Sequence, residues 1–203
     1  MNKNFNKFFI VYFAVSFLTT VAYAQNTLNF TNAAATGKDG PTQAQVTAAY
    51  DNTLLDDAVT INTQGIQEWT VPATGTYTIE TYGAQGGRSY LLNTSTLHDG
   101  GKGAKMVADF SLTQGDVLKI LVGQQGVEWA NGQRGAGGGG GSFVVLSSGT
   151  TLLMAAGGGG GAGDYAYDGH GNSGTSGSAG GNSSGNTGGL SGGSGGSGGN
   201  NST

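Results

Sequence analysis

The stretch that decides the fold is residues 136–161, which read AGGGGGSFVVLSSGTTLLMAAGGGGG. Two apolar runs, residues 142–146 and 150–155, lie on either side of a Ser-Ser-Gly sequence, and five consecutive glycines border each run. Glycine supplies the positive φ that a hairpin turn needs, so the two runs are predicted to form an antiparallel β-hairpin. The fold then depends on which strands accompany this hairpin and on whether the glycine runs are ordered.

Further strands are expected upstream of the hairpin. Residues 76–82 and 105–111 alternate between two sets of side chains, as half-buried strands do. Residues 117–122 are apolar except at Lys119, which is typical of a strand that is central in a sheet or covered on both faces. Short strands separated by turn residues predict an all-β fold, an antiparallel sandwich. The side chains available for its core include Trp69, Tyr77, Ile79, Phe110, Leu118, Ile120, Phe143, Val145 and Leu153.

The composition limits the class of protein. The chain has 203 residues, of which 42 are glycine and 2 are proline, and it has no cysteine. Because glycine destabilises a helix by about 1 kcal/mol per position relative to alanine, a helical bundle is excluded, and the low proline content excludes collagen. The lack of cysteine excludes disulfides, thiolate zinc sites and cysteine nucleophiles. A formal net charge of −4 provides no basic surface, so no nucleic-acid partner is expected.

Residues 1–24 have the pattern of a secretory signal peptide. Lys3 and Lys7 precede an apolar run at residues 8–18, and Ala-Tyr-Ala at residues 22–24 forms a small-x-small cleavage site. The alternative, a membrane anchor, needs an apolar run of about 20 residues, which is longer than this one. The mature protein is therefore predicted to be extracellular or at the cell surface, without a transmembrane segment in this chain.

The mature chain divides into three parts by composition. Residues 25–64 are expected to form an N-terminal segment that leads into the sandwich, with a short helix near residues 44–50 and a short strand near residues 59–61. Residues 65–168 are expected to form the glycine-rich β-sandwich domain. Residues 169–203 are a low-complexity Gly/Ser/Asn-rich tail.

The glycine repeats allow two interpretations. In the tail, Gly-Gly-Ser, Gly-Gly-Ser and Gly-Gly-Asn at residues 192–200 form either a flexible linker or a threefold extended helix with its serines on one edge. The pentaglycine runs at residues 137–141 and 157–161 are either disordered loops or ordered polyglycine helices, which need hydrogen bonds to neighbouring backbones. The core-like residues that flank both runs favour ordered polyglycine helices inserted into the sandwich. Valine at Gly139 or Gly159 is then expected to unfold the domain, because a Cβ atom would push neighbouring helices apart.

No constellation of residues indicates catalysis, so no enzyme activity is expected. The phosphate-loop pattern G-x-x-x-x-G-K-[ST] does not occur, and the G-x-S-x-G matches in the tail lack the strand and helix that a hydrolase requires. His98 and His170 are expected to be solvated loop residues. Asp164 and Asp168 resemble a calcium-binding nonapeptide, but the aspartate falls one residue early and no second copy follows. We therefore predict no catalytic, cofactor-binding or metal-ligating residue and no cofactor, and the ligand-binding residues are left open.

Five motifs in a fixed order carry a resemblance to a known domain. They are YGAQGG at residues 82–87, GKGA at residues 101–104, LVGQQG at residues 121–126 and the two alanine-flanked pentaglycine runs. This set resembles the glycine-rich domain of the anaplastic lymphoma kinase and leukocyte tyrosine kinase receptors, as also found in secreted bacterial glycine-rich proteins. The resemblance covers residues 28–163. It implies a jelly-roll-like, tumour-necrosis-factor-like sandwich with inserted glycine helices, in an extracellular domain that binds protein ligands.

The departures from these receptors limit what the resemblance implies. The chain lacks the D-F-G, H-R-D and V-A-I-K motifs of a kinase and the cysteines of the receptors, so no site residue is carried over. We predict a non-catalytic secreted or cell-surface protein, structural or adhesive, whose partner is an unknown protein or glycan. Because the sequence stops inside a Gly/Ser repeat, we expect it to be a piece of a longer surface protein.

Two other functions are weighed against this one. The alternative is an extracellular ligand-binding domain for protein or glycan, which an aromatic-lined concave face containing Trp129, Tyr90, Tyr165 or Tyr167 would favour. A secreted hydrolase with an unrecognised site would need clustered carboxylates or a Ser/His/Asp arrangement, and the two histidines leave little to build it from.

Overall fold

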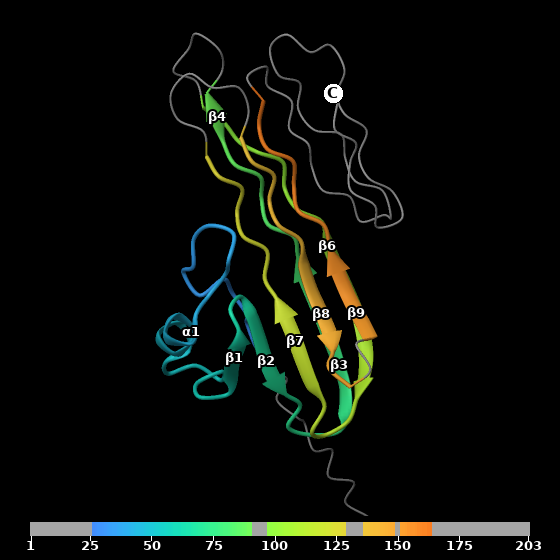
Figure 1. Ribbon diagram of the computed structural model, residues 1–203. Helices are drawn as coiled ribbons and strands as arrows, with labels where there is room; N and C mark the ends of the chain where they lie inside the picture. Colours follow the sequence, from blue (N-terminus) through green and yellow to red (C-terminus); the bar gives the residue numbers. More distant parts are fainter. Residues whose placement is uncertain (1–25, 91–96, 129–135, 149–150, 164–203) are drawn as a thin grey trace, which may run out of the picture.

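The computed structural model of the chain describes residues 26–90, 97–128, 136–148 and 151–163. These residues are mostly β-structure with one α-helix (Figure 1), which confirms the all-β prediction. The elements are, in chain order, α1 (Gln43–Tyr50), β1 (Val59–Thr63), β2 (Ile66–Thr70), β3 (Gly75–Tyr82), β4 (Ser89–Tyr90), β5 (Leu97–His98), β6 (Lys105–Leu112), β7 (Val117–Leu121), β8 (Ser142–Leu146) and β9 (Thr151–Ala156).

The larger sheet has five antiparallel strands in the order β1-β2-β7-β8-β9. β7 is its central strand, as the nearly continuous apolar sequence predicts, and Leu118 and Ile120 of this strand are buried. The hairpin of β8 and β9 is also confirmed, with Ser142 opposite Ala156. The strand expected near residues 59–61 is present as β1 and pairs with β2 at the opposite edge of the sheet.

β3 and β6 pair along their whole length in a separate antiparallel sheet. Tyr77 and Ile79 of β3 are half-buried against the core, whereas Thr76 and Thr78 are exposed, which confirms the alternation predicted for this strand. A third pair, β4 with β5, lies at the far end of the molecule in Figure 1. The core draws on the helix and on both longer sheets, and its buried side chains include Val46, Tyr50, Leu55, Trp69, Val71, Leu112, Leu118, Ile120, Val144 and Met154.

α1 confirms the short helix expected near residues 44–50. It begins with a capping box, in which the Thr42 hydroxyl accepts a hydrogen bond from the Gln45 amide and the Gln45 side chain accepts one from the Thr42 amide. Such reciprocal bonds satisfy two of the amides that a helix leaves free at its start. Val46 and Tyr50 then bury the inner side of the helix against the core.

β2 is a strand that the sequence pattern does not reveal, because a glutamine occupies one of its inward positions. Gln67 is fully buried, with 0% of its surface exposed. Its side-chain carbonyl accepts a hydrogen bond from the Tyr50 hydroxyl at 2.6 Å, and its side-chain amide donates to the carbonyl of Thr31 at 2.7 Å. A buried amide is tolerated when both of its ends are hydrogen-bonded. Gln67 therefore joins the N-terminal segment and α1 to the larger sheet.

A row of aromatic rings connects the same elements by edge-to-face contacts. The ring of Phe30 lies 6.4 Å from that of Tyr50 and 6.2 Å from that of Trp69, and Trp69 lies 6.1 Å from Tyr77, measured between ring centroids. Such pairs add about 0.5–1.5 kcal/mol each to the stabilisation that comes from burying apolar area. The row therefore ties the N-terminal segment, α1, the larger sheet and β3 together.

Two side chains expected in the core lie on the outer face of the larger sheet. β8 points Ser142 and Val144 inward, so Phe143 is 39% exposed and Val145 is only half-buried. The expectation that Phe143 belongs to the core is wrong, because an uninterrupted apolar run does not specify which face of the strand is inward. Pairing with the neighbouring strand decides this, and Phe143 lies opposite the equally exposed Leu121.

Candidate functional site

Five extended segments continue five of the strands beyond the sheets, and we name them the glycine bundle. In Figure 1 they run together from the sheets toward β4. Both pentaglycine runs lie in the bundle, and none of its described residues belongs to a helix or strand. The segments are residues 83–87 after β3, 100–104 before β6, 123–127 after β7, 136–141 before β8 and 157–162 after β9.

Hydrogen bonds from backbone to backbone join the segments. Residues 83–87 occupy the centre, because they are bonded to each of the other four segments. Representative bonds, with N–O distances of 2.8–3.0 Å, run from Gly86 to the carbonyl of Gly101, from Gly87 to that of Gly137, from Gly126 to that of Gln85 and from Gly159 to that of Ala84. Backbone N–H and C=O groups in the interior of the bundle are thus hydrogen-bonded to neighbouring segments and are not left unpaired.

The donors recur every three residues. In the segment before β8, the amides of Ala136 and Gly139 donate to the segment after β9, and the amides of Gly137 and Gly140 donate to the segment after β7. A strand has a period of two, whereas an extended chain with three residues per turn directs every third amide the same way. The hydrogen bonds of the bundle therefore follow a period of three.

The spacing of the segments leaves no room for side chains at the inward positions. A Cβ atom added to Gly159 would lie 1.8 Å from a carbonyl oxygen of a neighbouring segment, and one added to Gly139 would lie 2.2 Å from another such oxygen. At outward positions the space is open. A Cβ atom added to Gly157 would have no atom within 4 Å, and one added to Gly138 would have its nearest atom at 3.5 Å. The described glycines with positive φ all lie outside the bundle, so close approach of backbones is what requires glycine at the inward positions.

The far end of the bundle is a tip that combines charged and apolar side chains. The Arg88 guanidinium binds the Glu128 carboxylate at 2.5 Å and lies 3.9 Å from that of Asp99. Tyr90 lies opposite Leu97 in the β4–β5 pair, and both side chains are exposed, as is Val127 beside the ion pair. Exposed aromatic and aliphatic groups next to an arginine are typical of surfaces that bind other molecules. The tip is defined by Arg88, Tyr90, Leu97, Asp99, Val127 and Glu128.

Of the aromatic residues named for a binding face, the structure places Tyr90 at the tip. Trp129, Tyr165 and Tyr167 lie outside the described residues. The tip as a whole was not predicted, because Arg88 and Glu128 are far apart in the sequence and no motif links them. A single charged residue in a glycine-rich stretch does not indicate which distant residue it will pair with.

A charged cluster lies where the bundle meets β3 and β6. The Lys105 ammonium lies 3.0 Å from the Glu80 carboxylate and 5.1 Å from the centre of the Tyr82 ring, and the Tyr82 hydroxyl donates to Glu80. The hydrogen bond from Tyr82, followed by that from Lys105, lowers the pKa of Glu80 below its ordinary value of 4.5. The hydrogen bonds to Tyr82 and then to Glu80 raise the pKa of Lys105.

The pKa of Glu80 is expected to depend on its hydrogen bond from Tyr82. Since the pKa of Glu80 is lower in the folded chain than in the unfolded chain, its contribution to stability is present above pH 4.5 and is lost as the pH falls through the folded-state pKa. An NMR titration of the Glu80 carboxyl carbon should give a pKa below 4.5 in the parent chain and a higher one in Tyr82→Phe. An identical pKa in both chains would contradict the hydroxyl of Tyr82 as the main cause.

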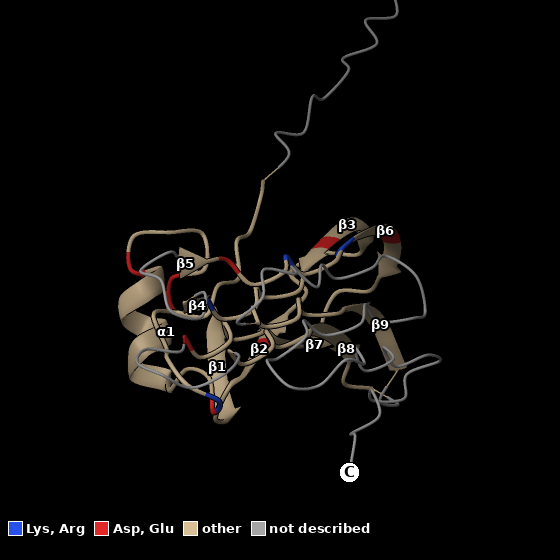
Figure 2. Cartoon of the chain, turned by 90° about the horizontal axis from the view of Figure 1, so that it is seen from above, with Lys and Arg blue, Asp and Glu red and all other residues tan. Residues whose placement is uncertain are grey.

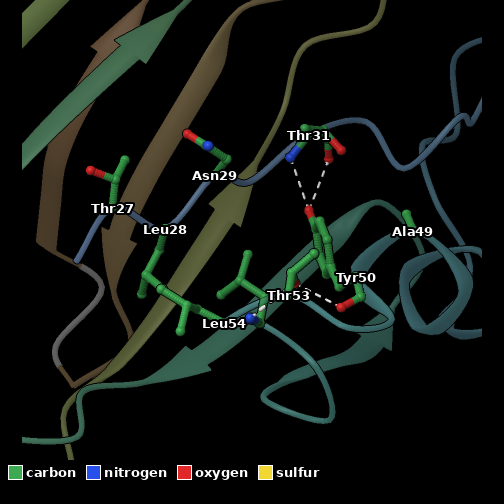
Figure 3. A pocket seen from close by; sticks show the side chains of 9 residues that line it. Thr27, Leu28, Asn29, Thr31, Ala49, Tyr50, Thr53 and Leu54 are labelled. Atoms are coloured by element: carbon green, nitrogen blue, oxygen red, sulfur yellow. Dashed lines mark hydrogen bonds between the residues drawn. The ribbon is translucent and has the colours of Figure 1, made fainter.

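A hollow of about 390 Å³ lies between the N-terminal segment and α1 with the turn that follows it (Figure 3). Leu28 and Leu54 line it together with threonine side chains. In its wall the Tyr50 hydroxyl accepts a hydrogen bond from the Thr31 amide at 2.9 Å. The lining residues include no carboxylate, amine, guanidinium or imidazole group, so apolar side chains, hydroxyl groups and the amide of Asn29 surround the hollow.

The described part of the chain contains no group of three or more His, Cys, Asp and Glu residues able to hold a metal ion. His98 lies in β5 opposite Ser89 and is half-buried, so the expectation of a solvated loop residue is wrong at this position. The short pairing of β4 with β5 is what holds it in a strand. His170, Asp164 and Asp168 lie outside the described residues.

Charged side chains are sparse in the described ranges. In Figure 2, which shows the molecule from above, the segments coloured blue and red are few and scattered along the parts of the chain that are drawn in colour. Within the same ranges, no helix has the length and apolar character needed to cross a membrane.

Comparison with known proteins shows a similarity to part of a receptor. No protein-family model matches the chain. The chain is similar to the leukocyte tyrosine kinase receptor of Mus musculus, with 40% identity over 101 residues. This match covers 48% of the chain but 11% of the receptor, and it falls in the glycine-rich extracellular region of the receptor and not in its kinase domain. The resemblance stated from the motifs is confirmed for that region, whereas the resemblance to secreted bacterial proteins stays a prediction.

Proposed function

We propose that the chain is a non-catalytic exported module, structural or adhesive, that presents its tip on a rigid glycine bundle. The observation that carries the proposal is the backbone bonding of residues 83–87 to four neighbouring segments. Bending such a bundle requires breaking several hydrogen bonds together, each of which contributes about 0.5–1.5 kcal/mol. The sheets supply the hydrophobic core at one end, and the tip lies at the other (Figure 1).

The bundle segments are, in this proposal, polyglycine helices inserted into a jelly-roll-like sandwich. The period of three in the donors supports the helices, because a polyproline-type helix has three residues per turn and no internal hydrogen bonds. Tyr77, Ile79, Met106 and Phe110 pack against the core of the larger sheet, which supports a sandwich of β3 and β6 against that sheet.

Export and the lack of catalysis belong to the same proposal. The signal-peptide pattern at residues 1–24 supports export, and so does the similarity to an extracellular receptor region. The matched part of that receptor is not its kinase domain, which supports a role without catalysis. The tip then serves as the contact with another surface, through Tyr90, Leu97 and the Arg88 guanidinium.

The alternative is an extracellular domain that binds one protein or glycan ligand, and the 40% identity to the receptor region favours it. The two functions differ in valency. A ligand-binding domain forms a stable complex with a soluble partner in solution, whereas an adhesive module holds a surface through many weak contacts that act together.

Beads coated with residues 25–203 test the tip as an adhesive contact, with an immobilised glycan array and immobilised extracellular proteins as the surfaces. The double variant Tyr90→Ala, Leu97→Ala is expected to lower adhesion roughly tenfold or more, because exposed aromatic and aliphatic anchors carry much of the binding energy of an interface. Leu152→Ala, at an even more exposed position on β9, is the control and should adhere like the parent.

Adhesion that survives the double variant would contradict the tip as the contact. Binding of the soluble monomer to one array component, with a saturable one-to-one curve, would favour the ligand-binding alternative. Absence of adhesion to every surface would leave the structural role and remove the adhesive one.

A further inference from the structure

The outer face of the larger sheet carries a continuous row of apolar side chains. Ile66 on β2, Leu121 on β7, Phe143 on β8 and Ala155 on β9 lie in register, each opposite the next. Leu121 and Phe143 are 38% and 39% exposed, Ala155 is exposed and Ile66 is half-buried. We name these four residues the apolar row. Leu152 lies one row farther from the bundle and is not part of it.

The apolar row departs from the usual pattern of a sheet face in water. An antiparallel sheet with one solvated face places apolar side chains inward and polar ones outward. The sheet of β3 and β6 follows this rule, with Thr76 and Thr78 exposed. β8 inverts it, because Ser142 is buried, with its hydroxyl donating to the Tyr82 carbonyl at 2.6 Å, while Phe143 points outward. The inward serine does not require phenylalanine at the next position, so contact with water does not explain the apolar row.

The charges of this sheet are compatible with contact between two identical faces. Its five strands contain two charged residues, Glu68 and Lys119, and the Lys119 ammonium lies 3.6 Å from the Glu68 carboxylate. Each copy therefore neutralises its own charges, and two such faces meet without like-charge repulsion. Interfaces between identical subunits are also more apolar than those between different proteins. Both properties favour a second copy of the chain as the partner of the apolar row.

The tail of the chain supplies few side chains that could cover the apolar row. Residues 169–203, which lie outside the described residues, contain Leu190 as their single large apolar residue. Tyr165 and Tyr167 follow closely on residues 157–162, a segment that leads away from the sheet toward β4 (Figure 1). A second copy, in contrast, supplies an apolar row of the same size and shape.

We propose that the apolar row is the contact between two copies of the chain, related by a twofold axis that runs between β7 and β8, parallel to the strands. Phe143 of one copy then packs against Leu121 of the other, and Ile66 packs against Ala155, so a larger side chain meets a smaller one in each pair. Face-to-face packing of sheets with nearly aligned strands is a common arrangement. This inference concerns the sheet and not the tip, so it goes beyond the proposed function and does not rest on it.

The size of the face predicts a weak dimer. Five strands about 4.8 Å apart, with about five residues each at a rise of about 3.4 Å, give a face of roughly 24 Å by 17 Å, or about 400 Å². A stable interface buries about 800 Å² on each partner. We therefore expect reversible dimers that become populated between roughly 10 μM and 1 mM, the range of weak interfaces.

Sedimentation equilibrium of residues 25–203 at about 10 μM to 1 mM tests the dimer. The mean mass is expected to rise with concentration from that of the monomer toward that of the dimer. Phe143→Lys should raise the dissociation constant roughly tenfold or more, because it places an unpaired charge in an apolar contact. The matched control, Val107→Lys, adds the same charge at a 51% exposed position on β6 and should dimerise like the parent. Phe143→Leu keeps an apolar side chain and should lose less affinity than Phe143→Lys.

Thermal unfolding followed by circular dichroism should show that these variants stay folded, since Phe143 and Val107 both face outward. Leu121→Lys, on the neighbouring strand, repeats the test should Phe143→Lys unfold. A monomer mass at every concentration up to about 1 mM would overturn the inference, and so would dimerisation that the lysine variants of the apolar row leave unchanged. A mass that continues to grow beyond that of the dimer would contradict a closed twofold contact.

The salt dependence of the dimer gives a second readout. Because the contact is apolar and the ion pair lies within each copy, raising NaCl from about 0.1 M to about 1 M should leave the dissociation constant unchanged or lower it. A dimer that is roughly tenfold weaker at the higher salt concentration would assign the contact to charged side chains and contradict the apolar row.

Discussion

Replacing Gly159 with alanine is expected to lower the free energy of unfolding by about 3 kcal/mol or more, because it overpacks the bundle and breaks its hydrogen bonds. The added Cβ atom would lie 1.8 Å from the carbonyl oxygen of Gly101, a backbone atom that cannot turn away as a side chain can. Moving the segments apart also disturbs the bonds from Gly159 to Ala84 and from Gly139 to Gly159, at 2.9 and 2.8 Å. Valine at Gly159 should have the same effect in greater measure. Urea unfolding of residues 25–203 measures the difference in the free energy of unfolding between the variant and the parent.

Gly157→Ala is the matched control in the same pentaglycine run. Its Cβ atom would have nothing within 4 Å, and its φ is not in the positive region. Replacing glycine by alanine at such a position stabilises by about 0.4–1 kcal/mol, since the unfolded chain loses freedom. The control should therefore unfold at the same urea concentration as the parent or a higher one. Equal losses in both variants would contradict close approach as the reason for glycine at residue 159.

Replacing Trp69 with alanine is expected to destabilise the fold by about 3–5 kcal/mol, the usual cost of removing a large buried aromatic side chain. Trp69 is buried in β2 and contacts Phe30 of the N-terminal segment and Tyr77 of β3. Its loss leaves a cavity and separates elements that are far apart in the sequence. Thermal unfolding followed by circular dichroism should show a lower midpoint.

Trp69→Phe is the control for this position, because it keeps an aromatic ring that can meet the edges of its neighbours. Its loss of stability should be clearly smaller than that of Trp69→Ala. A loss of stability below about 1 kcal/mol in the alanine variant would be small for a buried aromatic side chain. It would show that the aromatic row does not hold the sheets together.

The strands that could be predicted are those whose sequence alternates between two faces or forms a nearly continuous apolar run. β3 buries Tyr77 and Ile79 on one face, and β7 is central, so their sequences follow the simplest rules of a sheet. β2 was not predicted because Gln67 occupies an inward position. The side chain of Gln67 is hydrogen-bonded to residues of other elements, and no local sequence pattern encodes such partners. The outward position of Phe143 depends on its pairing with β7, which an unbroken apolar run does not specify.

The candidate site was predictable only in its composition. The five motifs of the resemblance fall on the five segments of the bundle, but they do not indicate that residues 83–87, which contain Ala84 and Gln85, form the central segment. Which glycines are inward depends on contacts between segments, as the difference between Gly157 and Gly159 makes plain. The tip arises from the packing of distant segments, since Arg88 meets Glu128 only after the bundle has formed.

The most direct test of the bundle is single-residue amide exchange at its internal donors in residues 25–203. The amides of Gly101, Gly139 and Gly159 donate to other segments at 2.8–2.9 Å, so they should be protected to an extent comparable with Leu118 and Ile120 in the central strand. Exchange of these three glycines at the rate of an unfolded chain, with the central strand still protected, would contradict a hydrogen-bonded glycine bundle and reduce its segments to flexible connections between strands.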